Sequence, residues 1–242
     1  MSMTRRQMIW TGMSGLVLAA GGCQTHQMAY NDRPGPLWPD DVNRPIPSGE
    51  LLRPEPPRVT GPTNPPEAPK APTGTVRAIP RSSWAKAGPI GSRVNPMGSV
   101  SMITVHHEGW TPVWFTDTGT TAGRLDSIRR SHLERLRAGD IGYHLIVDRG
   151  GHLWGGRNLG YQGAHVREHN EHNIGIMCLG NFDKQQPSDA QVATLRATIV
   201  TLMKQYRISS NKVYTHQELN KTECPGRVLQ AQMVQLRRNG LG

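Results

Sequence analysis

The stretch "SVSMITVHH" at residues 99–107 decides the fold class of this chain. It is rich in β-branched residues and is followed by Glu-Gly, as expected of a buried strand that ends at a turn. Other β-rich runs come later and are bounded by Gly, Asn and Asp: "YHLIVDRG" (143–150), "HLWGGR" (152–157), "NIGIMCLGN" (173–181) and the short "KVYTH" (212–216). These runs predict a sheet built from segments that lie far apart in the chain.

Helical patterns lie between and after these strands. Residues 121–139, "TAGRLDSIRRSHLERLRAG", lie at the end of a run of threonines that can cap a helix, and they carry an apolar stripe of Leu125, Ile128, His132 or Leu133, and Leu136. After Pro187, Ser188 and Gln191 form a capping-box pattern. The stripe that follows consists of Val192, Leu195, Ile199, Leu202 and Tyr206.

A last helix is predicted for "RVLQAQMVQLRR" (227–238), ended by Asn239-Gly240. Strands that alternate with helices are typical of layered α/β domains, because helices then cover a central sheet. The fold class predicted here is therefore α/β, a single domain with a central mixed sheet flanked by helices.

The first 23 residues have the pattern of an export signal. A charged segment, "TRRQMIW", precedes the short apolar run "TGMSGLVLAA" and the small residues "GGC". Ala20-Gly21-Gly22-Cys23 resembles a bacterial lipoprotein lipobox, and Arg5-Arg6 resembles a twin-arginine signal. By that resemblance Cys23 is lipidated, and the protein is exported and anchored by lipid to a bacterial cell membrane, facing the periplasm or cell wall.

Residues 24–75 carry most of the prolines, as in "RPEPPRVTGPTNPPEAPKAPTG" (53–74). Proline lacks the N–H that helices and sheets need, and so few large apolar residues cannot offset the entropy of ordering the backbone. We expect a disordered tether here. The predicted organisation is a signal peptide at 1–23, a linker at 24–75 and a folded domain at 76–242.

The chain is basic, with 28 Lys and Arg against 18 Asp and Glu and a net charge of +10. Such an excess favours anionic partners, which include nucleic acids, acidic lipids and cell-wall polymers. The basic run "SIRRSHLERLR" (127–137) fits one solvated helix face, and no nucleic-acid-binding motif accompanies it. Together with the export signal, this argues against a nucleic-acid partner.

A candidate metal site lies in "THQELNKTECPG" (215–226). His216 and Cys224 flank a loop, and a third ligand can come from the strand at 99–107, which ends in His106-His107. Adjacent strand residues face opposite sides, so only one of the two rings can join the site. Two imidazoles and a thiolate leave one position of tetrahedral zinc open, and such zinc lowers the pKa of a water ligand from about 15.7 toward about 7. This chemistry suits attack on an amide at neutral pH.

Six motifs occur in an order that resembles peptidoglycan recognition proteins and the phage lysozyme-type N-acetylmuramoyl-L-alanine amidases. They are "IPRSSWAKAGP", "ITVHHEG", "DIGYHLIVDRGG", "GGRNLGYQGAH", "HNIGIMCLGNF" and "HQELNKTECPG". The resemblance spans residues 76–236, which is essentially the whole predicted domain. It implies the fold of these proteins and Zn²⁺ as the cofactor.

Carried over by position, the resemblance implies zinc ligands at His106, His216 and Cys224. It implies a catalytic tyrosine at Tyr143 of "GYH". In the phage enzymes a lysine stands two residues before the cysteine; Thr222 occupies that place here, as in amidase-active recognition proteins, and it would orient the water or the oxyanion. Family members that only bind the wall have usually lost the cysteine, so its presence favours an enzyme.

Substrate contacts are expected from His165 of "GAH", from Arg157 and from the pair Gly160-Tyr161. Two of these have a second interpretation: Arg157, which follows two glycines, can anchor a turn, and His165 can fix a loop. The dipeptide before "GAH" helps select the third stem residue in recognition proteins, where Gly-Trp is associated with diaminopimelate. Gly160-Tyr161 therefore favours diaminopimelate-type stems.

The predicted function is hydrolysis of the amide between N-acetylmuramic acid and L-alanine of peptidoglycan; the alternative is a non-catalytic recognition module. The expected partners are peptidoglycan or muropeptides, and a membrane through the lipid anchor; we expect a monomer. A phenol stays protonated near neutral pH, so Tyr143 is expected to donate a hydrogen bond. No proton donor for the leaving amine is assigned among the nearby carboxylates Glu108, Glu218 and Glu223.

Structural roles are expected for several other side chains. Cys178 lies in an apolar run and is expected to be a core thiol. His107 and His144 are expected to be histidines of the sheet with satisfied hydrogen bonds, and Trp84 and Trp154 to be packing residues. The histidines expected on surfaces or loops are His132, His152, His169 and His172.

Overall fold

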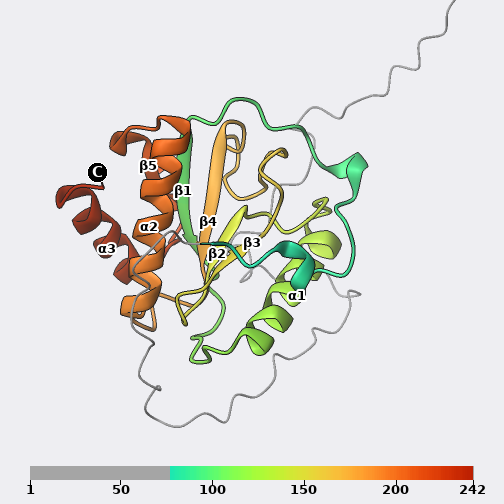
Figure 1. Cartoon of the computed structure of the whole chain (residues 1–242), viewed down its shortest axis with the longest axis horizontal. Helices are drawn as coiled ribbons and strands as arrows, with labels where there is room; N and C mark the ends of the chain where they lie inside the picture. The colour runs from blue at the N-terminus through green and yellow to red at the C-terminus, as the bar shows by residue number, and fades with distance from the viewer. Residues whose placement is uncertain (1–76, 242) are drawn as a thin grey trace, which may run out of the picture. The chain divides into compact units, whose positions relative to one another are not determined.

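The β-rich runs form one five-stranded sheet in the computed structural model, which describes residues 77–241 (Figure 1). The strands are β1 (Met102–His107), β2 (Leu145–Val147), β3 (Leu153–Gly155), β4 (Asn173–Cys178) and β5 (Val213–Thr215). Their order is β3-β2-β4-β1-β5, and only β3 runs antiparallel to its neighbour. The predicted mixed sheet is confirmed. The export signal, Cys23 and the tether lie outside the described residues.

The register of the parallel strands gathers their C-terminal ends along one edge of the sheet. His107 of β1 pairs with Cys178 of β4, which in turn pairs with Val147 of β2. The loops that follow these three strands therefore start side by side. In open α/β sheets this edge is where functional side chains collect.

Three helices cover the sheet: α1 (Thr118–Arg135), α2 (Asp189–Tyr206) and α3 (Arg227–Arg238). The cap predicted for the first helix is wrong, because the Asp117 carboxylate, not a threonine hydroxyl, accepts the Thr120 amide at 2.7 Å. Ser188 caps α2 as predicted, but the Gln191 side chain donates to the carbonyls of Val147 and Leu179 instead of closing the box. Within the described part of the chain, every helix is too short or too polar to span a bilayer.

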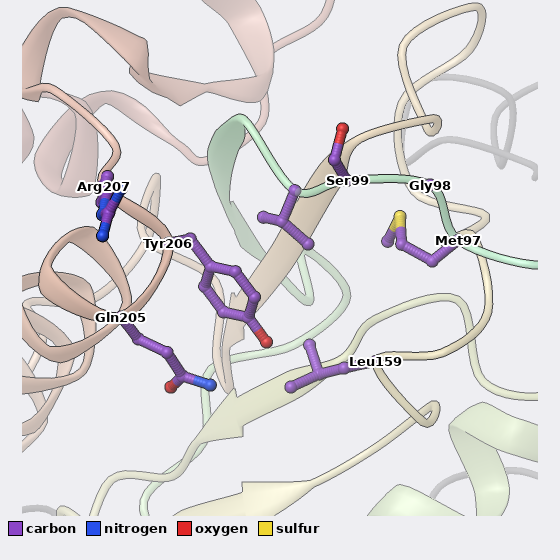
Figure 2. A pocket seen from close by; sticks show the side chains of 8 residues that line it. Met97, Gly98, Ser99, Leu159, Gln205, Tyr206 and Arg207 are labelled. Carbon is purple, nitrogen blue, oxygen red and sulfur yellow. The ribbon is translucent and has the colours of Figure 1, made fainter.

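A hollow of about 530 Å³ lies at the N-terminal end of β1 (Figure 2). Its lining comes from the segment before β1, from Leu159 and from the end of α2, where Tyr206 and Arg207 lie. His106 and His107 are at the opposite end of the strand. The hollow is therefore separate from the predicted metal site.

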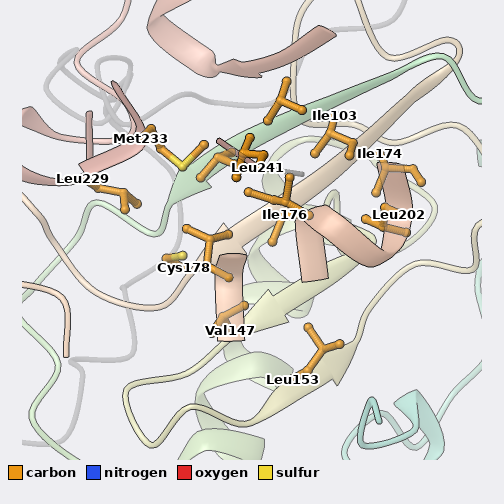
Figure 3. Close-up of a cluster of buried hydrophobic side chains, with 14 of the residues drawn as sticks. Ile103, Val147, Leu153, Ile174, Ile176, Cys178, Leu202, Leu229, Met233 and Leu241 are labelled. Atoms are coloured by element: carbon orange, nitrogen blue, oxygen red, sulfur yellow. The ribbon is translucent and has the colours of Figure 1, made fainter. Parts of the chain in front are cut away.

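Two apolar clusters hold the layers together. On one face of the sheet, Ile103, Ile176 and Cys178 pack against α2 and α3 (Figure 3). On the other face, Ile146 and Met177 pack against Leu125 of α1. Cys178 is fully buried, and burial raises the pKa of its thiol, which confirms a core role.

The segment before β1 closes the free edge of β3. Ile79 forms a parallel bridge with Trp154, and its amide donates to the Leu153 carbonyl at 2.7 Å. Arg81 makes a two-pronged ion pair with buried Asp140, with N–O distances of 2.8 and 2.9 Å. Both tryptophans predicted to pack are buried, and the Trp84 indole donates to the Gly155 carbonyl. The sheet edge is thus capped by Ile79, from the segment that precedes β1.

Candidate functional site

The three predicted metal ligands meet at the C-terminal end of β1. His106 lies on β1, His216 is the first residue after β5, and Cys224 lies in the loop before α3. Their possible ligand atoms all lie within 4.8 Å of one another, and all three residues are buried. The Cys224 Sγ is 3.6 Å from Nδ1 of His106. The structure therefore brings together residues separated by more than a hundred positions.

One carboxylate fastens the turn that carries His216. The turn η6 (His216–Glu218) begins with a capping box, in which the Thr215 amide donates to Glu218 at 2.9 Å. Gln230 and Arg237 of α3 donate to the same carboxylate. Burial acts to raise the pKa of Glu218, but these hydrogen bonds outweigh it and lower the pKa to about 2. The Glu218 carboxylate thus ties the turn that carries His216 to α3, and its role is structural.

A second clamp holds the cysteine loop. The Gln217 amide donates to the Cys224 carbonyl at 2.8 Å, and the Cys224 amide donates to Oγ1 of Thr222 at 3.2 Å. Gly226 follows with φ of 85°, and a Cβ there would lie 2.7 Å from the backbone of Phe182. Thr222 thus shapes the loop that presents the thiol. Its predicted catalytic role stays a prediction.

Hydrogen bonding fixes the tautomer of His106. The Asn173 carbonyl can only accept, so Nε2 of His165 donates to it across 3.3 Å and leaves Nδ1 of His165 as an acceptor. Nε2 of His106, 3.1 Å from that Nδ1, must then carry its own proton. The lone pair of His106 is left on Nδ1, the atom that faces the thiol. A histidine that binds a metal through one ring nitrogen usually donates a hydrogen bond from the other, as Nε2 of His106 does here.

The imidazoles of the cluster are neutral. Burial, reinforced by neighbouring histidines, holds the pKa of His106 well below its usual value, and burial lowers the pKa of His216 to about 3. Neutral imidazoles offer lone pairs, and with a thiol they form the nitrogen and sulfur donor set that zinc prefers. The side chains present therefore fit a zinc ion with three protein ligands.

Tyr143 lies beside this cluster. Its ring centroid is 5.2 Å from that of His106, and the residue is only 9% exposed. Burial raises the pKa of the phenol well above 10, with further contributions from Cys224 and Glu108. The hydroxyl therefore stays protonated and can act only as a neutral hydrogen-bonding group, as expected from the sequence.

The predicted substrate residues all make contacts within the fold. Arg157 is 3% exposed and donates to the carbonyls of Asp140, Ile141 and Gln162, which is the turn-anchoring arrangement. His165 is fully buried behind His106. Gly160 and Tyr161 pair with Met97 and Pro96, near the N-terminal end of β1. Substrate contacts from these residues stay predictions.

Other histidines serve the fold. His107 accepts the Phe182 amide at 3.3 Å on the face of the sheet opposite to His106, and His144 bridges the Gly175 amide and the Tyr161 carbonyl at 3.0 Å each. Both predictions of satisfied sheet histidines are confirmed. The surface assignment of His132 is wrong: its Nδ1 accepts the Gly142 amide at 2.8 Å and its ring lies 5.7 Å from that of Tyr143. The position of His132 in the apolar stripe of the helix correctly indicated that its side chain faces the fold.

His144 should make the domain sensitive to mild acid. Burial lowers its pKa from 6.5 to about 4 in the folded chain, although its hydrogen bond with the Tyr161 carbonyl acts to raise the pKa. A lowered histidine pKa stabilises the fold fully above about 6.5, and this stabilisation, on the order of 3 kcal/mol, is lost as the pH falls toward 4. Urea unfolding at pH 7, 6, 5 and 4 should show this slope, and His144→Gln should make it shallower without removing it, because burial also lowers the pKa of His132 to about 4 and that of His216 to about 3. An unchanged slope in the variant would assign the acid sensitivity elsewhere.

The loop at residues 109–117, "GWTPVWFTD", follows the histidine pair and was not among the predicted site residues. Trp110 lies under the guanidinium of Arg124 at 5.1 Å, and Trp114 lies under that of Arg149 at 4.8 Å. Arg124 also pairs with buried Glu108 at 2.5 Å. Burial raises the pKa of Glu108 to about 6, although Arg124 opposes the shift. The sequence signal for this loop was the presence of two tryptophans within nine residues, next to the candidate ligand His106.

The chain is similar to known amidases and peptidoglycan-recognition proteins. Residues 96–227 match the family described as N-acetylmuramoyl-L-alanine amidase. A peptidoglycan-recognition protein of Drosophila simulans is 31% identical, over 62% of this chain and 82% of that protein. An N-acetylmuramoyl-L-alanine amidase of Sus scrofa is 29% identical, over 62% of this chain but only 25% of the pig protein.

A solved structure shares the fold. Peptidoglycan recognition protein LE in complex with tracheal cytotoxin, a monomeric diaminopimelic acid-type peptidoglycan, superposes with a TM-score of 0.58 at 25% identity, over 64% of this chain and 92% of that one. The family match covers more than half of the 242 residues and includes all three candidate ligands. The chain belongs to the N-acetylmuramoyl-L-alanine amidase family, Amidase_2.

Proposed function

We propose that this chain is a zinc-dependent amidase that hydrolyses the bond between the lactyl group of N-acetylmuramic acid and L-alanine of the peptidoglycan stem. The single observation that carries the proposal is the buried cluster of His106, His216 and Cys224, with its ligand atoms within 4.8 Å. Family membership and the amidases among the relatives support the reaction class. The intact thiol supports turnover rather than recognition alone.

The residues of the site have different proposed roles. His106, His216 and Cys224 would hold the ion, which when bound supplies Lewis acidity and an activated water. Behind them, His165 and the Asn173 carbonyl keep the His106 lone pair on Nδ1. Tyr143 donates a hydrogen bond to the amide oxygen as negative charge develops there, since its buried phenol keeps its proton. Preorganised donors of this kind need no rearrangement during the reaction.

The second candidate function is peptidoglycan binding without turnover. It is favoured by the recognition proteins among the relatives and by the relative solved with tracheal cytotoxin. Such a module needs the fold but neither the metal nor a buried phenol next to it. We also propose that the substrate carries a diaminopimelate-type stem, on the strength of Gly160-Tyr161, and that export and lipidation at Cys23 place the protein at the cell wall.

The test is product analysis on purified muropeptides. Full-length protein with zinc should release free stem peptides whose N-terminus is L-alanine, identified by mass, and chelation should abolish their release. Added zinc should restore it. If no stem peptide appears although zinc is bound, the amidase proposal fails and the binding module takes its place.

A further inference from the structure

The loop at residues 109–117 is held rigidly over the C-terminal edge of the sheet. Asn181, which follows β4, donates to the carbonyls of Gly109 and Trp110 at 2.8 and 3.2 Å. Gln185 accepts the Val113 amide at 2.6 Å and donates to the Val113 carbonyl at 3.0 Å. Val113 itself is buried. The loop therefore presents its remaining side chains in fixed positions, which lowers the entropic cost of binding a ligand.

Trp114 is one of two large apolar side chains exposed in the described domain, at 38%; the other is Ile90. It follows buried Val113 directly, so its backbone cannot move away from the sheet. The guanidinium of Arg149 lies over its ring at 4.8 Å. An exposed aromatic ring on a rigid loop is typical of a binding surface, where Trp and Arg are the residues that contribute most.

The two tryptophan–arginine pairs of the loop differ in charge balance. Arg124, over Trp110, is neutralised by Glu108. Arg149 donates to the Gln186 carbonyl at 3.1 Å, but among residues 77–241 it forms no ion pair with an acidic side chain. Arg149 is itself only 8% exposed, and it thus leaves a largely buried positive charge without an acidic partner beside the exposed ring of Trp114. A carboxylate on the ligand would complement it.

The position of Trp114 and Arg149 in the fold indicates which part of a muropeptide they can contact. The Gly160 carbonyl accepts the amide of Met97, which precedes β1, whereas the loop begins beyond the C-terminal end of β1. His106 is at the C-terminal end of a strand that rises about 3.3 Å per residue over six residues. If the stem peptide runs from the metal cluster toward Gly160, the muramoyl sugar on the other side of the scissile amide points toward Trp114.

We propose that Trp114 and Arg149 form a subsite for the glycan strand of peptidoglycan. A sugar ring packs its C–H face on the indole, and Arg149 pairs with the carboxylate of a neighbouring muramoyl unit, which is free once the stem of that unit has been released. The proposal rests on the proposed function for its orientation. It assigns binding, not chemistry, to both residues.

Binding without hydrolysis tests this subsite. The full chain, kept in chelator, is titrated by calorimetry with stem-free glycan strands of alternating N-acetylglucosamine and N-acetylmuramic acid, and separately with chitotetraose, which has no carboxylates. Wild type should bind both and the strands more tightly. Trp114→Ala should weaken both by about tenfold, as for a central tryptophan of an interface, whereas Trp114→Phe should retain most of the affinity. Arg149→Met should weaken only the strands.

Ile90→Ala is the matched control, since Ile90 is as exposed as Trp114, at 37%, and should bind like wild type. Wild-type affinity in Trp114→Ala, or no binding of either probe to wild type, would overturn the subsite whatever the amidase assay gives. Undiminished strand binding by Arg149→Met would overturn the role of the carboxylate. Because neither probe contains the scissile amide, these results do not depend on whether the protein is an amidase.

Discussion

Cys224→Ser should remove most of the zinc from the protein. A neutral hydroxyl is a far poorer zinc ligand than a thiolate, and the buried position 3.6 Å from Nδ1 of His106 gives the ion no substitute donor of the same charge. The zinc affinity should fall by more than about 100-fold, beyond the range seen when only a supporting residue is lost. Metal analysis after dialysis against a weak chelator measures this directly.

Cys178→Ser is the matched control for that experiment. Cys178 is also fully buried, but its side chain packs in the apolar cluster against α2 and α3, on the opposite face of the sheet from His106. This change should lower the free energy of unfolding, since a hydroxyl replaces a thiol in an apolar site, and it should leave zinc content unchanged. Full zinc occupancy in Cys224→Ser would contradict the ligand assignment.

Tyr143→Phe should leave zinc in place and slow turnover by about 10²- to 10³-fold, the usual loss when one donor to a developing oxyanion is removed. The change keeps the ring that packs in the cluster with Leu125 and Ile141, so the fold should persist. The fall should appear in kcat with little change in KM, because the hydrogen bond strengthens as charge develops.

Tyr206→Phe makes the same substitution at the far end of β1, beside the hollow, and should leave kcat unchanged. A wild-type kcat in Tyr143→Phe would exclude the phenol from catalysis. A loss of both zinc and turnover would instead show that Tyr143 supports the metal site.

The metal cluster was predictable because its residues carry local signals. A strand rich in β-branched residues ends in His106-His107, His216 follows a short strand directly, and a turn with Pro-Gly follows Cys224. The support behind the ligands had no such signal. His165 reaches His106 only because the loop before β4 folds behind β1, and this depends on the register between Met102 and Asn173. Long-range pairing of that kind leaves no periodicity in a single segment.

Competition between equally suitable polar groups explains the smaller errors. Asp117 and three nearby threonines can all cap α1, and the carboxylate wins at the position that precedes the helix. Gln191 suits a capping box, yet its side-chain amide donates instead to the carbonyls of Val147, at the end of β2, and Leu179, just after β4. These outcomes depend on buried groups from other strands, which local sequence rules do not include.

The bridge between Ile79 and β3 determines how mechanical load enters the domain. Tension transmitted through the chain that precedes residue 77 acts first on the hydrogen bonds of Ile79 with Leu153 and Gly155, and then on the ion pair between Arg81 and Asp140. β3 occupies one end of the strand order, and the strands that lead to the metal ligands, β1 and β5, occupy the other. A pull from that side would therefore strain the edge opposite the ligands first, so the domain can yield where the preceding chain enters it while the ligand geometry stays intact.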